Sequence, residues 1–282
     1  MADKVCLLTG ASSGIGRAAA LTLADRGVRL LLACRDGDRG EAVLAEVRRR
    51  GGADRAQLLV ADLASQAEVR RLATEVRVRT DRLDVLINNA GLVTSRREIT
   101  EDGLETTLAV NHLAPFLLTN LLLNQLSTSA RVVTVASDAH RSGAICLDDL
   151  HGELRWRTYR AYAQSKLANV LFTYELSRRL STSGVTANCL HPGLVGTRIF
   201  NNTPWPARLV IAPMSLFFAS SSKGAEGVVK LALAPEMEGV TGRYFDRTEE
   251  AHSSAASHDV ELALRLWDVS ERLTGLASAA TA

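Results

Sequence analysis

Short apolar runs alternate with longer amphipathic stretches along most of the chain. The apolar runs are bounded by glycine or polar residues, which is typical of buried strands. These expected strands span residues 5–9, 28–33, 57–61, 82–87, 131–136, 185–190 and 242–246. Helical patterns span residues 17–26, 39–50, 101–123, 158–180, 222–234 and 260–273, and a further helix is expected to start near Ser65.

Strands that alternate with helices predict a parallel sheet with helices on both faces. We therefore expect an α/β fold with a doubly wound, Rossmann-type sheet of about seven strands. Because there is no internal repeat and no linker, residues 1–282 are expected to form a single domain. A stretch rich in proline and bulky apolar residues, about 195–222, is interpreted as a substrate-facing flap, with a peripheral helix as the alternative. The Ala/Ser-rich tail, about 275–282, is expected to be loose.

A glycine-rich turn joins the first strand to the first helix. Gly14, Gly16 and Ala19 satisfy the spacing G-x-G-x-x-A directly after an expected strand. Glycines at this spacing allow the backbone to approach a pyrophosphate closely, and the helix N-terminus offers it free N–H groups. This context favours a dinucleotide site over a plain glycine-rich turn. The turn residues expected to bind the cofactor are Gly10, Ser12, Ser13, Gly14, Ile15 and Gly16.

The end of the second strand distinguishes between two cofactors. An acidic residue there binds the ribose 2′-hydroxyl of NAD, whereas an arginine accommodates the 2′-phosphate of NADP. Cys34 occupies the position expected for the acid, and Arg35 follows it. We therefore expect NADP(H) in preference to NAD(H). Asp36 is the competing residue: it would serve NAD if it turned toward the ribose, but it also precedes a helix that it can cap.

Polar and small residues follow the later strands, at the edge where such sheets bind their ligands. Asp62 is interpreted either as a contact to an adenine amino group or as an N-cap of the helix near Ser65, and both remain open. Asn88 and Asn89 can bond loop backbones or ribose hydroxyls. The expected cofactor contacts at this edge are Asp62, Leu63, Asn89, Ala90, Gly91, Pro192, Gly193, Val195 and Thr197.

Tyr162 and Lys166 stand four residues apart in an expected helix, so their side chains share one face. A phenol ordinarily ionises near about pH 10, and a neighbouring cation lowers its pKa. Lowering it by ~3 units requires about 4 kcal/mol, which a lysine and a positively charged cofactor together can supply. The tyrosine is then expected to act as a general acid and base near neutral pH. Taken alone, the motif is weak, and two common residues on an amphipathic helix are the favoured interpretation.

Composition and charge exclude several classes of protein. The chain is 46% hydrophobic, and its formal net charge of +2 comes without a basic block, so no nucleic-acid partner is expected. Four scattered cysteines without a CxxC pair indicate reduced thiols in a cytoplasmic protein. Six histidines without metal-binding spacing predict no metal site. The N-terminus does not resemble a signal peptide, and no stretch is judged long enough for a transmembrane segment.

Several motifs occur together in a characteristic order. They are Thr9-Gly10-x-x-x-Gly14-x-Gly16, Asn88-Asn89-Ala90-Gly91, Asn111, Ser137, Tyr162-x-x-x-Lys166 and Pro192-Gly193. Over nearly the whole chain this set resembles the short-chain dehydrogenase/reductase superfamily. Finer motifs, at residues 110–116 and 191–193, resemble the retinol dehydrogenase branch and its bacterial relatives.

The resemblance implies hydride transfer between NADP(H) and a carbonyl or alcohol. It implies that Tyr162 passes the proton, and that Lys166 lowers the pKa of Tyr162 and binds the nicotinamide ribose. Ser137 would bond the reacting oxygen, and Asn111 would hold a water in a proton relay. The resemblance also implies a homodimer, formed through the helix that carries Tyr162 and the helix at 222–234.

The substrate is expected to be apolar and bulky: a retinal-like aldehyde, a ketone or a secondary alcohol. The expectation rests on large apolar residues of the expected flap, namely Phe200, Trp205, Leu209, Met214, Leu216 and Phe217. Two rival functions remain, a non-catalytic NADP(H)-sensing regulatory protein and an NAD-dependent alcohol dehydrogenase of the same fold. A dehydratase or epimerase is a third rival, which the glycine spacing and modest length disfavour.

Overall fold

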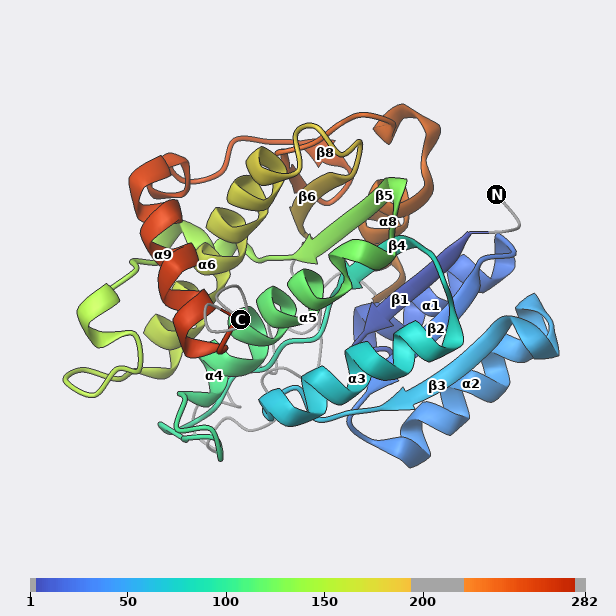
Figure 1. The fold of residues 1–282 in the computed structure, drawn as a ribbon, viewed down its shortest axis with the longest axis horizontal. Coiled ribbons are helices and arrows are strands. Elements are labelled where there is room, and N and C mark those ends of the chain that lie inside the picture. Colours follow the sequence, from blue (N-terminus) through green and yellow to red (C-terminus); the bar gives the residue numbers. More distant parts are fainter. Residues whose placement is uncertain (1–3, 194–220, 277–282) are drawn as a thin grey trace, which may run out of the picture.

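The computed structural model describes residues 4–193 and 221–276 of the chain. Its strands form one sheet in the order β3-β2-β1-β4-β5-β6-β7-β8 (Figure 1). The strand bounds are β1 Val5–Thr9, β2 Arg29–Cys34, β3 Ala56–Val60, β4 Leu83–Asn88, β5 Leu126–Val135, β6 Thr186–His191, β7 Tyr244–Asp246 and β8 Glu249–Glu250. Neighbouring strands are parallel except β7 and β8, so the expected doubly wound α/β fold is confirmed.

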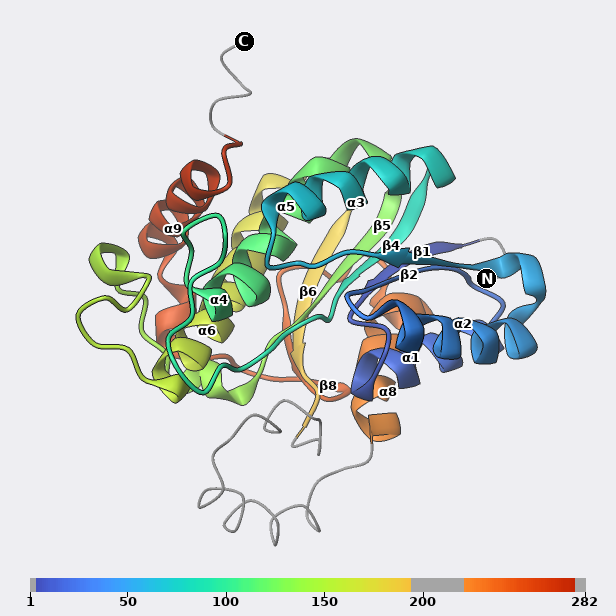
Figure 2. The same cartoon turned by 90° about the horizontal axis from the view of Figure 1, so that it is seen from below.

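Helices cover both faces of the sheet. Their bounds are α1 Gly14–Asp25, α2 Gly37–Gly51, α3 Gln66–Arg79, α4 Thr106–Leu108, α5 Ala114–Leu122, α6 Thr158–Arg179, α8 Ser221–Leu233 and α9 Val260–Leu273. The helices α1, α2 and α8 lie on one face, and α3, α5 and α6 lie on the other, with α9 packed against α6 (Figure 2).

The period-two alternation of the strands divides the core into two layers. Cys6 and Leu8 of β1 join the layer beneath α1, α2 and α8, whereas Leu7 joins the layer beneath α3, α5 and α6. The same alternation holds in β2, where Leu30 and Leu32 face one layer and Leu31 faces the other. Burial on both faces explains why these strands are continuous apolar runs.

Two elements differ from the expectation. The sheet has eight strands among the described residues, because the two-residue β8 pairs antiparallel to β7. Its residues, Glu249 and Glu250, are exposed and carry no apolar pattern that would predict a strand there. The expected helix at 101–123 starts later, at Thr106, and contains a π-helical turn, Ala109–Leu113.

The stretch Thr106–Gln125 is the one described segment that is long and apolar enough to cross a membrane. The expectation that no stretch reaches that length is therefore wrong. However, 78% of its most apolar window is buried inside the molecule, as in a core helix that packs between a sheet and other helices. The expected flap lies almost entirely outside the described residues, as do residues 277–282 of the expected loose tail.

Candidate active site

The turn between β1 and α1 is shaped by glycines that leave no room for side chains. Gly10 and Gly14 have φ values of 70° and 53°, which glycine adopts without strain. A Cβ at Gly16 would lie 2.2 Å from the carbonyl oxygen of Gly10, and a Cβ at Gly10 would lie 2.9 Å from Ala90 Cα. The turn therefore presents bare backbone at the helix N-terminus. This is the surface that a pyrophosphate requires, so the residues fit a dinucleotide.

Asn89 fixes this turn to the end of β4. Its side-chain Nδ2 donates to the carbonyl of Thr9 at 2.8 Å and to that of Gly10 at 3.3 Å. The Thr9 hydroxyl in return accepts from the backbone N–H groups of Asn89 and Ala90, at 3.0 and 3.1 Å. Asn88 instead turns into the core, where it donates to Thr119. The expected bonding to loop backbone is therefore shown by Asn89 and not by Asn88.

Arg35 and Asp36 occupy different environments at the end of β2. Asp36 is the N-cap of α2: its Oδ1 accepts from Arg39 N at 3.0 Å, and its Oδ2 lies 3.1 Å from Arg39 Nε. The expected capping role of Asp36 is therefore confirmed. Arg35 is exposed, and no ion pair to it occurs in the part of the chain that is described. The backbone nitrogens of Gly10 and Ala11 donate to the Ala33 carbonyl at 2.8 and 3.3 Å, so the glycine turn and the end of β2 lie together.

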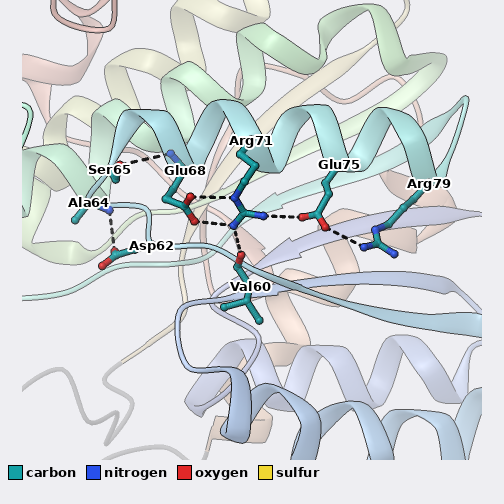
Figure 3. A network of polar contacts seen from close by, with 8 residues as sticks. All are labelled: Val60, Asp62, Ala64, Ser65, Glu68, Arg71, Glu75 and Arg79. Carbon is teal, nitrogen blue, oxygen red and sulfur yellow. Dashed lines mark hydrogen bonds and ion pairs between the residues drawn. The ribbon is translucent and has the colours of Figure 1, made fainter.

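Asp62 follows β3 and closes a tight turn before α3 (Figure 3). Its Oδ1 accepts from Ala64 N at 3.0 Å, whereas the N-cap of α3 is Ser65, whose Oγ accepts from Glu68 N. The alternative of Asp62 as the helix N-cap is therefore wrong. Along α3, Arg71 pairs with Glu68 and Glu75 and donates to the Val60 carbonyl. This ladder fastens the first turn of the helix to the end of β3.

Tyr162 and Ser137 lie together beyond the carboxyl end of β5. Ser137 follows the strand; its hydroxyl accepts from Ala139 N at 3.3 Å and lies close enough to the phenol of Tyr162 to affect its pKa. Burial raises the pKa of Tyr162, and the neighbouring Ser137 hydroxyl opposes that rise. The described residues therefore do not produce the expected lowering of the Tyr162 pKa by Lys166, because desolvation of the phenolate is the larger effect.

Lys166 is held on the same face of α6, one turn after Tyr162. Its side chain is 4% exposed, and its Nζ donates to the Val135 carbonyl at 2.9 Å. The Nζ lies 5.7 Å from the centroid of the Tyr162 ring. Burial lowers the pKa of Lys166 to about 8. The ammonium is thus anchored to the end of β5, with its charge beside the phenol.

Asn111 lies fully buried in the π-helical turn and braces the neighbouring loop. Its Oδ1 accepts from Leu92 N at 2.8 Å, and its Nδ2 donates to Leu92 O at 2.9 Å and to Ser165 Oγ at 3.0 Å. Ser165 then donates to the carbonyl of Tyr162. A Cβ at Gly91 would lie 3.3 Å from Asn111 Oδ1 and 3.5 Å from Lys166 Nζ, so these groups surround one point. A π turn inside a helix is frequent at functional sites.

The remaining expected contacts follow β6. Pro192 and Gly193 are buried directly after the strand, and Gly193 has a φ of 86°. Val195 and Thr197 lie outside the described residues. Sequence reasoning assigned no role to Thr9 or Ser165, although both bond site residues. Thr9 belongs to the glycine-turn motif and Ser165 stands beside Lys166, and a polar side chain in these two positions was the available signal. No group of metal-binding side chains occurs within residues 4–193 and 221–276.

Comparison with known proteins agrees with this geometry. The short chain dehydrogenase family matches residues 4–206. The chain is 42% identical to retinol dehydrogenase 14 from Homo sapiens, over 98% of this chain and 88% of that protein. It is 43% identical to polyprenol dehydrogenase from Mus musculus, over 96% of this chain and 84% of that protein.

A solved structure of a related enzyme has the same fold. The short chain dehydrogenase from Burkholderia cenocepacia J2315, crystallised in complex with NADP, superposes with a TM-score of 0.70 at 27% identity, over 87% of this chain and 97% of that chain. The family match covers the glycine turn, Ser137, Tyr162 and Lys166 in one continuous stretch. The chain therefore belongs to the short chain dehydrogenase family, and is an oxidoreductase related to the retinol dehydrogenases.

Proposed function

We propose that this protein is an NADP(H)-dependent carbonyl reductase or alcohol dehydrogenase. One observation supports the proposal above all: Ser137, Tyr162 and Lys166 converge beside a backbone turn that fits a dinucleotide. A nicotinamide cofactor supplies the hydride when bound. The side chains of this protein supply the remaining requirements of the reaction, which are a proton at the substrate oxygen and a hydrogen bond to that oxygen.

The proposed roles follow from the contacts. Tyr162 donates a proton to the carbonyl oxygen, and Ser137 donates a hydrogen bond to the same oxygen as negative charge develops there. Lys166, held by Val135, places a positive charge near the phenolate that remains. Asn111 keeps the loop after β4 in position through Leu92, and we propose that it also holds the water of a proton relay.

The preference for NADP(H) is proposed from the end of β2. Asp36 is occupied as a helix cap, which leaves the exposed Arg35 as the charged side chain available to a 2′-phosphate. The structure of the related short chain dehydrogenase from Burkholderia cenocepacia contains NADP, which agrees with this preference. The residues that would hold the cofactor are the glycine turn, Arg35, Asp62, Asn89, Gly91 and Gly193.

A bulky apolar substrate is proposed from the relatives named above. Retinol and polyprenol are both apolar isoprenoid alcohols, and enzymes named for them are 42% and 43% identical to this chain. The apolar residues expected to face the substrate, such as Trp205 and Phe217, lie outside the described residues. The homodimer, the cytoplasmic location and the absence of a nucleic-acid partner stay predictions.

Replacing Tyr162 by phenylalanine tests the reaction. The variant should bind NADPH as the wild type does, but aldehyde reduction should fall by about 10²-fold or more, since the proton donor is gone. Tyr159→Phe is the matched control, because Tyr159 lies on the same helix, is 62% exposed and bonds Ser142. Equal rates in the wild type and Tyr162→Phe would contradict the assignment, and the absence of any turnover would favour the NADP(H)-sensing alternative.

A further inference from the structure

His140 is a buried histidine next to the candidate site, and it has no role in the reaction described above. It lies three residues after Ser137, in the 3₁₀ turn Asp138–Ser142 that follows β5. Its side chain is fully buried, and its ring centroid lies 4.8 Å from that of Tyr244. A buried imidazole must satisfy two ring nitrogens, so its partners reveal what it holds together.

The two ring nitrogens of His140 bond two separate segments. Nδ1 lies 2.7 Å from the carbonyl oxygen of Ser137, and Nε2 lies 3.0 Å from the backbone nitrogen of Ser254. A backbone N–H can only donate, so Nε2 accepts and carries no proton. The proton is therefore on Nδ1, which donates to Ser137. The hydrogen bonds thus select one neutral tautomer of the ring.

The bond from His140 Nδ1 restrains Ser137, whose hydroxyl lies beside the phenol of Tyr162. The Ser137 carbonyl also accepts from the backbone nitrogen of His140 at 3.1 Å, so two donors fix it. The Ser137 hydroxyl in turn lies beside the phenol of Tyr162 and lowers its pKa. Because the carbonyl and side chain of one residue move together, a rotation of the Ser137 backbone would displace its hydroxyl from the phenol.

At the other end, Ser254 belongs to a loop that is itself fastened to α6. The neighbouring Ser253 bonds the hydroxyl of Tyr174 at 2.7 Å and Nε2 of His258 at 3.1 Å. Tyr174 stands three turns after Tyr162 on the same helix. The C-terminal loop, residues 251–258, is therefore a fixed support, and His140 connects this support to the turn that carries Ser137.

We propose that His140 is a positioning residue of the reaction: as its neutral Nδ1–H tautomer, it clamps the Ser137 turn to the C-terminal loop and so holds the Ser137 hydroxyl at the phenol of Tyr162. The proposal rests on the function proposed above. Burial lowers the pKa of His140, which agrees with a neutral ring. The charged or titratable groups around it are Asp138, Arg141 and His191.

Two isosteric replacements separate the two bonds. The side-chain amide of asparagine reaches the place of Nδ1, whereas that of glutamine reaches the place of Nε2. His140→Asn can therefore still donate to Ser137, and His140→Gln cannot. We expect both variants to lower kcat with an unchanged Kd for NADPH, because each breaks one of the two bonds of the clamp. His140→Gln should lose more, about tenfold or more, because it removes the donor to Ser137 itself. A wild-type kcat in both variants would overturn the proposal.

A second pair tests the tautomer without altering His140. Ser254 has a φ of −66°, which proline adopts, so Ser254→Pro removes the N–H that bonds Nε2. Ser254→Ala keeps this N–H and removes only a buried hydroxyl that has no hydrogen-bond partner among the described residues. Ring ¹⁵N chemical shifts, assigned with His140→Asn, should show the Nδ1–H tautomer in the wild type and Ser254→Ala. Ser254→Pro should show a tautomer mixture and a lower kcat.

The outcomes distinguish the positioning role of His140 from the proposed function of the protein. A wild-type ring that carries its proton on Nε2, or a Ser254→Pro variant with unchanged tautomer and kcat, would overturn the role of His140. A wild-type protein that shows the Nδ1–H tautomer but reduces no carbonyl would refute the proposed function, and with it the positioning role. The ¹⁵N measurement needs no substrate, and the Ser254 pair remains decisive if the His140 variants do not fold.

Discussion

Protonation of His112 is expected to destabilise the fold in mildly acidic solution. His112 is 1% exposed in the π-helical turn, and its Nε2 lies 2.9 Å from Ser270 Oγ on α9. The Ser270 hydroxyl donates to Leu266 O, so it accepts from the Nε2–H of His112. Burial lowers the pKa of His112 from 6.5 to about 4, and the neighbouring Asn169 side chain opposes that shift only in part.

The sign and size of the effect of pH on the free energy of unfolding follow from the lowered pKa of His112. His112 binds a proton more weakly in the folded protein than in the unfolded chain. The free energy of unfolding is therefore not reduced by His112 above about pH 6.5, and it falls as the pH drops toward 4. A group with these two pKa values destabilises the fold by about 2 kcal/mol at pH 5 and by about 3 kcal/mol at pH 4. Near pH 7 the effect is close to zero.

Urea unfolding at pH 7 and pH 5 measures the effect, with His112→Gln as the reference that cannot titrate. The wild type should lose about 2 kcal/mol more than this variant between the two pH values. The comparison cancels the contributions of His140 and His191, whose pKa values burial also lowers. Ser270→Ala should be less stable at both pH values but keep the pH dependence. The same pH dependence in the wild type and His112→Gln would refute the reasoning.

Two further predictions concern the cofactor site. Gly16→Ala places a Cβ 2.2 Å from the Gly10 carbonyl, so it should lower the free energy of unfolding by about 1–3 kcal/mol and weaken NADPH binding about tenfold. Gly37→Ala is the matched control at the start of α2, where the nearest atom is 3.6 Å away, and thermal unfolding and NADPH titration should show no loss. Arg35→Ala should raise the Kd for NADPH about tenfold and leave that for NADH unchanged in fluorescence titrations, and equal effects on both cofactors would contradict a phosphate contact.

Much of the fold could be predicted from the pattern of apolar residues. Strands buried on both faces are short, apolar and bounded by turn residues. The core strands therefore have bounds within one or two residues of those expected, except that β5 begins five residues earlier, at Leu126. The helix Val260–Leu273 was predicted with the same bounds, since its apolar face repeats with helical periodicity. The strand β8 could not be predicted, because pairing with β7 and not a local pattern creates it.

The site was harder to predict because its geometry depends on contacts between residues that are distant in the sequence. The glycine turn could be recognised, but the bonds that close it come from Asn89, about 80 positions later. The rise in the Tyr162 pKa could not be predicted, since burial of a side chain on an amphipathic helix depends on what packs over it. His140 likewise gains its role only from Ser254, which lies 114 positions away.

Transfer of an isotope label from cofactor to product tests the central claim most directly. NADPH deuterated at C4 of the nicotinamide, on either face, would be mixed with the protein and a retinal-like aldehyde, and the alcohol analysed by mass spectrometry. The proposed function predicts deuterium in the alcohol with the wild type and Tyr159→Phe, and a rate at least about 10²-fold lower with Tyr162→Phe. Tight binding of NADPH without any labelled alcohol from aldehydes or ketones would contradict it.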